Sequence, residues 1–141
     1  MPVARVPCGN GHVLVANFHG LWDATGRYGK GDFPERLDVS RAVRAATDVH
    51  QDPLLLCGDF NLLPGTQALE ILASGGLRNL VLECGVTNTR THLYRSFDTG
   101  APLFADYVLM SPALKLVQFD VLPDVVSDHA ALRVDFEWGH S

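Results

Sequence analysis

LLLCGDFN, residues 54–61, is the stretch that decides the fold. Its first four residues form a continuous apolar run, which is the pattern of a strand buried on both faces of a sheet. We therefore predict a strand over residues 54–57, ended by Gly58 and Asp59. The polar residues Asp59 and Asn61 would then lie at a strand end, where a rigid backbone can hold functional groups in place.

The segment before this strand has the pattern of a strand, a loop and a helix. Residues 12–18 (HVLVANF) form a short, valine-rich apolar run, which favours a strand. Residues 21–33 are rich in glycine and charge and are predicted to form a loop. A helix is predicted over residues 34–50, because apolar residues recur on one stripe and Pro34 suits a first helical turn. The charged residues placed mostly outside that stripe are Arg36, Arg41, Arg44 and Asp48.

The segment after the strand predicts one more helix and several strands. Thr66 can cap a helix that runs to about residue 74, and Gly75 and Gly76 can end it. Further strands are expected near residues 80–82, 105–110, 116–121 and 131–136, the last two as a meander around Pro123. This order predicts an α+β domain with one mixed sheet and helices packed mainly on one face. Both early strands look apolar on both faces, so something else should cover the other face.

Length and composition set limits on the class of protein. The chain has 141 residues, which suits a single domain over residues 1–141, and 47% of them are hydrophobic. The formal net charge of −5 argues against a dedicated DNA-binding protein without excluding one, because carboxylates at a metal site count as negative until the metal binds. Cys8, Cys57 and Cys84 form no CxxC pair, which predicts reduced thiols and a cytoplasmic location. No apolar run approaches the length needed to span a membrane.

Polar residues repeatedly follow the predicted strands. If the strand ends meet at one edge of the sheet, three carboxylates, two imidazoles and a carboxamide would converge there. Carboxylate and amide oxygens suit Mg²⁺ or Mn²⁺, whereas zinc is less favoured because no paired His or Cys spacing is present. The strand-end residues are Asn17, His19, Asp59, Asn61, Asp106, Asp128 and His129.

Four of these strand-end segments resemble motifs of a known family. Residues 17–20 (NFHG), 58–61 (GDFN), 105–109 (ADYVL) and 127–129 (SDH) resemble, in the same order, the later motifs of the endonuclease/exonuclease/phosphatase (DNase I-like) family. The resemblance covers nearly the whole chain. It implies half of a four-layer α/β/β/α sandwich, namely the C-terminal half, with one mixed, mainly antiparallel sheet and helices on one face.

The resemblance also implies a role for each matching residue. His19 would contact the scissile phosphate or assist the leaving group. Asp59 would orient or deprotonate the attacking water and contribute to the metal site, and Asn61 would hold that water or a phosphate oxygen. The remaining roles are a hydrogen bond to the catalytic histidine for Asp106, a metal-site carboxylate for Asp128, and a phosphate contact for His129.

The chain departs from the family pattern in its first half. The family has an earlier strand that ends in Asn and another that ends in a metal-binding Glu, and nothing of that kind precedes His12. Two hypotheses follow. One is Mg²⁺- or Mn²⁺-dependent hydrolysis of phosphodiester or phosphomonoester bonds in a nucleic acid or a small molecule. The other is a catalytically silent binding or self-assembly module. The sheet face that the first half would cover predicts a homodimer or a partnership with that half.

Each of these residues also has a purely structural interpretation. Asp59 could cap a turn, Asp128 could be a helix N-cap or a turn residue, and His19 and Asp106 could be ordinary strand-end or buried residues. We favour the site interpretation because four motifs occur in order. Asn17 is predicted to be structural, because it precedes His19 and points to the opposite face of the strand.

Several other polar residues remain undecided. Residues 26–31 (GRYGKG) lack the Ser or Thr of a phosphate-binding P-loop, which excludes that motif. For Arg27, Lys30 and Arg36, solvated loop charge is favoured over phosphate contact. Trp22 could stack on a substrate or close the loop, and Arg90, Thr91 and His92 could line the cleft. The remaining histidines, His12, His50, His92 and His140, form no spaced ligand set and are predicted to lie at the surface.

Overall fold

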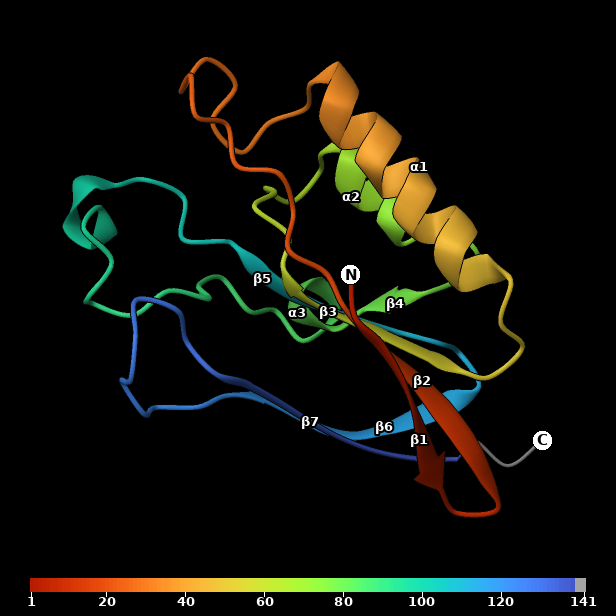
Figure 1. Ribbon diagram of the computed structural model, residues 1–141. Helices are drawn as coiled ribbons and strands as arrows, with labels where there is room; N and C mark the ends of the chain where they lie inside the picture. Colours follow the sequence, from red (N-terminus) through yellow and green to blue (C-terminus); the bar gives the residue numbers. More distant parts are fainter. Residues whose placement is uncertain (139–141) are drawn as a thin grey trace.

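The computed structural model describes residues 1–138, which form a five-stranded sheet between a helical layer and a two-stranded sheet (Figure 1). The elements in chain order are β1 (Val3–Cys8), β2 (Gly11–Asn17), α1 (Pro34–Asp48), β3 (Leu54–Asp59), α2 (Gln67–Leu72), β4 (Arg78–Asn79), α3 (Leu80–Glu83), the 3₁₀ turn η1 (Phe97–Thr99), β5 (Asp106–Met110), β6 (Leu114–Val121) and β7 (Leu132–Trp138).

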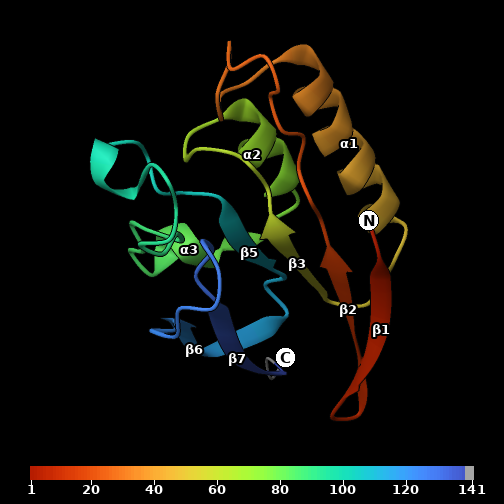
Figure 2. The same ribbon diagram turned by 60° about the vertical axis from the view of Figure 1, so that its left-hand side comes forward.

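The large sheet is mixed and mainly antiparallel, as predicted. Its strand order is β1-β2-β3-β5-β4, and only β2 and β3 run parallel to each other. Figure 2 shows α1 and α2 on one face of this sheet and β6 and β7 on the other. The crossover from β2 to β3 through α1 brings the carboxyl ends of both strands to the same edge.

Strand alternation divides the core into two clusters. Along β3, Leu54 and Leu56 face the helices, while Leu55 and Cys57 face the two-stranded sheet. Along β5, Tyr107 and the leucine two residues later continue the helix-side cluster. The apolar run at residues 54–57 is therefore continuous because both faces of the strand are covered.

The cover of the second face comes from the C-terminal strands. β6 and β7 were expected within one mixed sheet, but they form a separate antiparallel pair, with an irregularity between Leu116 and Gln118. The turn after β5, in which the Leu114 N–H donates to the Ser111 carbonyl, leads the chain away from the large sheet. Inward residues of this pair, from Leu114 to Trp138, then pack on Val13, Leu55 and Val108.

Two local expectations were wrong. Residues 80–82 form part of helix α3 and not a strand, because the Asn79 side chain accepts a hydrogen bond from the Leu82 N–H at 3.3 Å and caps the turn. Arg36 and Arg44 were placed outside the buried stripe of α1, yet both are buried, at 3% and 9% exposed. Their long apolar stems cover core surface. The Arg36 guanidinium donates to loop carbonyls, whereas Arg44 pairs with Asp48 through Nη2 and leaves Nε and Nη1 buried without a partner.

One strand and several surface positions complete the description. β1 was not expected, and it pairs antiparallel with β2 at the edge of the sheet. His50 and His92 are exposed and His12 is half-buried, while His140 lies outside the described residues. Within residues 1–138, the helices are all too short or too polar to cross a membrane.

Candidate active site

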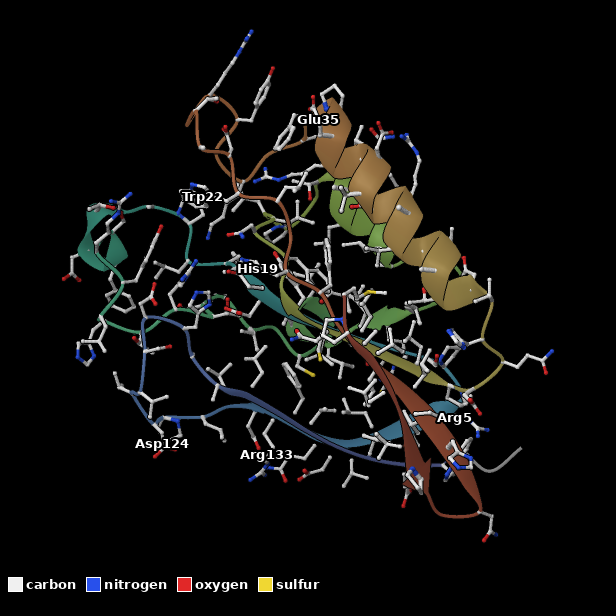
Figure 3. The ribbon with its side chains drawn as sticks, viewed as in Figure 1. Arg5, His19, Trp22, Glu35, Asp124 and Arg133 are labelled. Carbon is white, nitrogen blue, oxygen red and sulfur yellow. The ribbon has the colours of Figure 1, made fainter. Side chains whose placement is uncertain are left out.

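The predicted site residues meet at the edge of the large sheet where β3 ends and β5 begins. Asp59 is the last residue of β3 and pairs in register with Asp106, the first residue of β5. The loop before β7 carries Asp128 and His129 to the same edge, where His129 forms an isolated antiparallel bridge with Arg90. Figure 3 shows His19 on the segment that follows β2, at this side of the sheet.

Two glycines let the backbones approach closely at this edge. After β2 ends, the Phe18 N–H donates to the Cys57 carbonyl and the Gly20 N–H donates to the Asp59 carbonyl, both at 2.8 Å. A Cβ atom on Gly58 would overlap the Phe18 carbonyl oxygen, and one on Gly20 would overlap the Phe60 carbonyl oxygen. The glycines of the NFHG and GDFN motifs are therefore required for the segments that carry His19 and Asp59 to lie side by side.

His129 is held by Asp106. The imidazole Nδ1 lies 2.8 and 3.0 Å from the two carboxylate oxygens of Asp106, whose side chain is 16% exposed. Burial raises the pKa of Asp106, and the hydrogen bond from His129 opposes that shift. Thr89 fixes the backbone beneath this pair, because its hydroxyl accepts hydrogen bonds from the Ala105 and Asp106 N–H groups at 3.0 and 3.2 Å.

Arg90 contacts the other side of His129. Its Nη1 atom lies 2.6 Å from the imidazole Nε2 and donates to an Asp128 oxygen at 2.9 Å. Because a guanidinium group can only donate, Nε2 must accept in this arrangement, and Nδ1 carries the proton that is donated to Asp106. The arginine side chain is 5% exposed and its guanidinium carbon lies 4.6 Å from the centre of the Tyr94 ring.

Asp59 lies between the two histidines. One of its oxygens accepts from the Asn61 N–H at 3.0 Å, while the other lies 3.7 Å from His129 Nε2 and 3.8 Å from His19 Nε2. The His19 side chain is 78% exposed, whereas that of His129 is 31% exposed. Asn61 is buried with a positive φ of 52°, and its amide donates to the Gly20 carbonyl at 3.3 Å.

An open hollow of about 590 Å³ joins these residues. The structure thus brings the five predicted catalytic side chains and Asp128 to one place, although the Asp106 carboxylate is turned toward His129 and away from the hollow. The residues that line the hollow are His19, Trp22, Asp59, Asn61, Arg90, Leu93, Tyr94, Arg95, Asp128 and His129.

Sequence reasoning named seven of these ten lining residues, with Trp22 and Arg90 left undecided, and did not consider Leu93. Arg90 was only a candidate for lining the cleft, and Tyr94 and Arg95 were not considered. Thr91 is buried away from the hollow, with its hydroxyl donating to the Ser127 carbonyl. Asn17 does not join the cluster, in line with its predicted structural role.

The carboxylates do not form a complete metal site by themselves. In the part of the chain from residue 1 to 138, no group of three or more His, Cys, Asp or Glu side chains is placed to hold a metal ion. The Asp106 oxygens face His129, and one Asp128 oxygen is paired with Arg90. A Mg²⁺ ion, which prefers six oxygen ligands, would need ligands from outside these residues.

The fold and the strand-end cluster together define a DNase I-like α+β domain. The family described as the endonuclease/exonuclease/phosphatase family matches residues 2–129, and the chain belongs to that family. No curated protein matches the chain.

Solved structures with the same fold are distant in sequence. An endonuclease/exonuclease/phosphatase family protein from Bacteroides thetaiotaomicron has a TM-score of 0.68 at 20% identity, over 93% of this chain and 52% of that one. The human nocturnin catalytic domain with bound sulfate has a TM-score of 0.59 at 20% identity, over 91% and 47%. A Bacteroides thetaiotaomicron mannosyl-6-phosphatase has a TM-score of 0.61 at 21% identity, over 92% and 53%.

The chain therefore spans about half the length of the solved structures that it matches. At these identities the likeness shows the fold alone.

Proposed function

We propose that this chain supplies one half of a phosphoesterase site, which hydrolyses phosphodiester or phosphomonoester bonds. The observation that carries the proposal is the Asp59, His129 and Asp106 cluster at a sheet edge, beside the buried cation of Arg90. Membership of the family and the likeness to a mannosyl-6-phosphatase and to nocturnin support phosphate esters as the class of substrate.

Each residue has a role that follows from its contacts. The free Asp59 oxygen can accept a proton from the attacking water and aim that water at phosphorus. Arg90 lines the hollow and can stabilise the charge that develops on the phosphoryl oxygens, and His129 can do so once Nε2 takes up a proton in place of the Arg90 contact. His19 is exposed opposite them and can assist the leaving group, and Asn61 holds the His19 segment against β3 through Gly20.

Dependence on Mg²⁺ or Mn²⁺ is part of this proposal, with Asp128 and Asp59 as the ligands from this chain. Because the described residues do not complete a metal site, no catalytic step is assigned to the ion. The missing ligands would come from the first half of the family fold or from a second copy of the chain.

The experiment is hydrolysis of bis(4-nitrophenyl) phosphate by the chain in the oligomeric form in which it purifies, with Mg²⁺ and with Mn²⁺. Asp59→Ala should lower kcat/KM by roughly 10²–10⁴-fold, the range for loss of a general base. Asp124→Ala, at an exposed carboxylate of the β6–β7 loop, is the control and should change nothing. Absence of metal-stimulated turnover, together with an Asp59→Ala variant that behaves like the parent, would overturn the proposal.

The lack of a three-ligand cluster favours a second candidate, a silent binding or assembly module. Titration calorimetry with Mn²⁺ separates the two. Millimolar or tighter binding that is lost in Asp59→Ala or Asp128→Ala favours the working site. Absence of binding at millimolar metal favours the module.

We also propose that the chain associates with a second copy or with the first half of the family fold. β1 and the β6–β7 pair leave sheet edges unpaired, and exposed edges tend to find partners. Sedimentation at high concentration should show a two-fold dimer if the second copy is the partner. A strictly monomeric chain would overturn the dimer.

A further inference from the structure

A second hollow, of about 350 Å³, lies next to the active-site hollow and shares Trp22 and Tyr94 with it. We call it the aromatic pocket. Three aromatic side chains and one cation contribute to its wall, together with small and apolar residues from three separate loops. The residues that matter here are Trp22, Tyr28, Lys30, Leu63, Tyr94 and Pro102.

The loop that forms this wall is fixed by buried polar residues. The Asp23 carboxylate is 7% exposed and accepts hydrogen bonds from the Thr25 hydroxyl and N–H and from the N–H groups of Tyr28 and Gly29. These bonds, led by the one from Thr25, lower the pKa of Asp23 to about 2. The Arg36 guanidinium donates to the carbonyls of Leu21 and Gly29 from the other side. The pocket wall is thus held in shape before any ligand arrives.

Lys30 was expected to be a solvated loop charge, but the structure places it inside this wall. Its ammonium group donates to the Phe104 carbonyl and lies 5.8 Å from the centre of the Tyr94 ring. Burial, with the nearby charge of Arg90, lowers the pKa of Lys30 to about 8, although Asp59 and Asp106 act in the opposite direction. Among residues 1–138, no carboxylate lies within ion-pair distance of this cation.

Two of the three aromatic side chains of the pocket are exposed to solvent. Trp22 is 59% exposed and Tyr28 is 43% exposed. Large exposed rings beside a preformed hollow indicate a binding surface, because they offer flat apolar area at little cost in conformational entropy. An ammonium group with donors to spare at the edge of such a surface suits a ligand that is flat and has hydrogen-bond acceptors on its rim.

We propose that the aromatic pocket binds a planar heteroaromatic group of the phosphate ester, such as a nucleobase, while the phosphate lies beside His129 and Arg90. The proposal rests on the proposed function and names its class of substrate. The base would stack on Trp22 or Tyr94, the two residues that join the hollows, and Lys30 would donate to an acceptor on the rim of the base. The net charge of −5 favours a compact nucleotide over a long nucleic acid, which binds best to a basic face.

The test compares adenosine 5′-monophosphate with ribose 5-phosphate, which carries a hydroxyl group at C1 in place of the base. Binding is followed by titration calorimetry and by quenching of tryptophan fluorescence, with Trp22→Leu identifying the part of the signal that comes from Trp22 and not from Trp138. The nucleotide should bind roughly tenfold more tightly, as expected for one stacked base, and Trp22→Leu should reduce the ratio to about one. Lys30→Met should weaken the nucleotide severalfold and leave ribose 5-phosphate unchanged. Lys115→Met, at an exposed lysine of β6, is the matched control.

Two further ligands separate this inference from the proposed function. Adenosine carries no phosphate, so quenching of Trp22 by adenosine supports the pocket even if hydrolysis is absent. Equal affinity for the nucleotide and for ribose 5-phosphate, with hydrolysis that needs Asp59, would overturn the pocket and leave the phosphoesterase intact. A single-stranded decanucleotide that binds much more tightly than the mononucleotide would overturn the assignment of a compact ligand.

Discussion

The two faces of the five-stranded sheet differ in how tightly they are packed. On the helix side, Leu56, Phe60, Tyr107 and Leu109 are all completely buried beneath α1 and α2. On the other side, the β6–β7 pair covers the sheet but leaves a half-open hollow of about 310 Å³, lined by residues such as Leu55, Val108, Leu132 and Val134. The side chains that line this hollow lack packing partners on its open side.

The two faces of the sheet therefore differ in how completely they are covered. The helix side is a well-covered core, whereas within residues 1–138 the other side is covered by two strands, each with an unpaired edge. The chain also spans about half the length of the structures that it matches. We propose that the β6–β7 pair belongs to a second sheet, whose other strands would cover this hollow and complete the active-site edge.

The largest expected contrast comes from two neighbouring leucines on β3. Leu56→Ala removes a fully buried side chain from the helix side and should lower the free energy of unfolding by about 3–5 kcal/mol. Leu55→Ala, on the side of the hollow, should cost about 2 kcal/mol, because part of its surroundings is already empty. Denaturation by urea, with equal slopes for both variants, gives the two values.

The milder pair Leu56→Val and Leu55→Val keeps the comparison available if either alanine variant fails to fold. Equal costs at the two positions would contradict the proposed contrast, since they would mean that the second face is packed as tightly as the first in solution.

The sequence predicted this architecture where the signals were local. The apolar run at residues 54–57 indicated a strand covered on both faces, and the motifs around Asp59 and His129 placed polar groups at strand ends. The run at residues 80–82 was assigned wrongly, because so short an apolar segment has no periodicity that distinguishes a strand from a helix. Nothing in the residue pattern showed which face would be loosely packed, because that depends on how β6 and β7 pack on the large sheet.

The residues that line the active-site hollow and the aromatic pocket were harder to predict for a related reason. Arg90 meets Asp128 and His129 across 38 and 39 positions of sequence, and Lys30 meets the Phe104 carbonyl across 74. Such contacts are made by tertiary packing and leave no local signature. Arg36 was misplaced because a charged helix residue is usually solvated, whereas here the carbonyls of the 21–31 loop need a donor.

A smaller effect is expected from the buried hydroxyl group of Tyr107, on the helix side of the sheet. Tyr107 donates to the Leu62 carbonyl at 2.9 Å, and burial raises its pKa above the ordinary value near 10. The folded chain therefore holds the phenolic proton more tightly than the unfolded chain does. This contribution is fully present below about pH 10, and stability falls by up to about 1.4 kcal/mol per pH unit above it.

Tyr107→Phe tests that prediction. The variant should lose about 1–2 kcal/mol at pH 7, because the Leu62 carbonyl loses its donor, and its alkaline slope should be shallower than that of the parent. Tyr28→Phe, at a tyrosine that is 43% exposed, is the control. If the free energy of unfolding falls with pH as steeply in Tyr107→Phe as in the parent, the Tyr107 hydroxyl is not buried in solution.

The smallest expected effect comes from adding one methylene group to each face of the five-stranded sheet. It tests whether the hollow beside β6 and β7 exists in solution. Val43→Ile, in the helix-side cluster, should destabilise the chain by about 1 kcal/mol, because that core has no spare volume. Val134→Ile, on the wall of this hollow, should stabilise it by about 0.5 kcal/mol, because the added group gains contacts without displacing any. If Val134→Ile is destabilising as well, the space is already filled in solution. A penalty that grows with protein concentration would then identify a second copy of the chain as the occupant, because only self-association is shifted by the concentration of the chain itself.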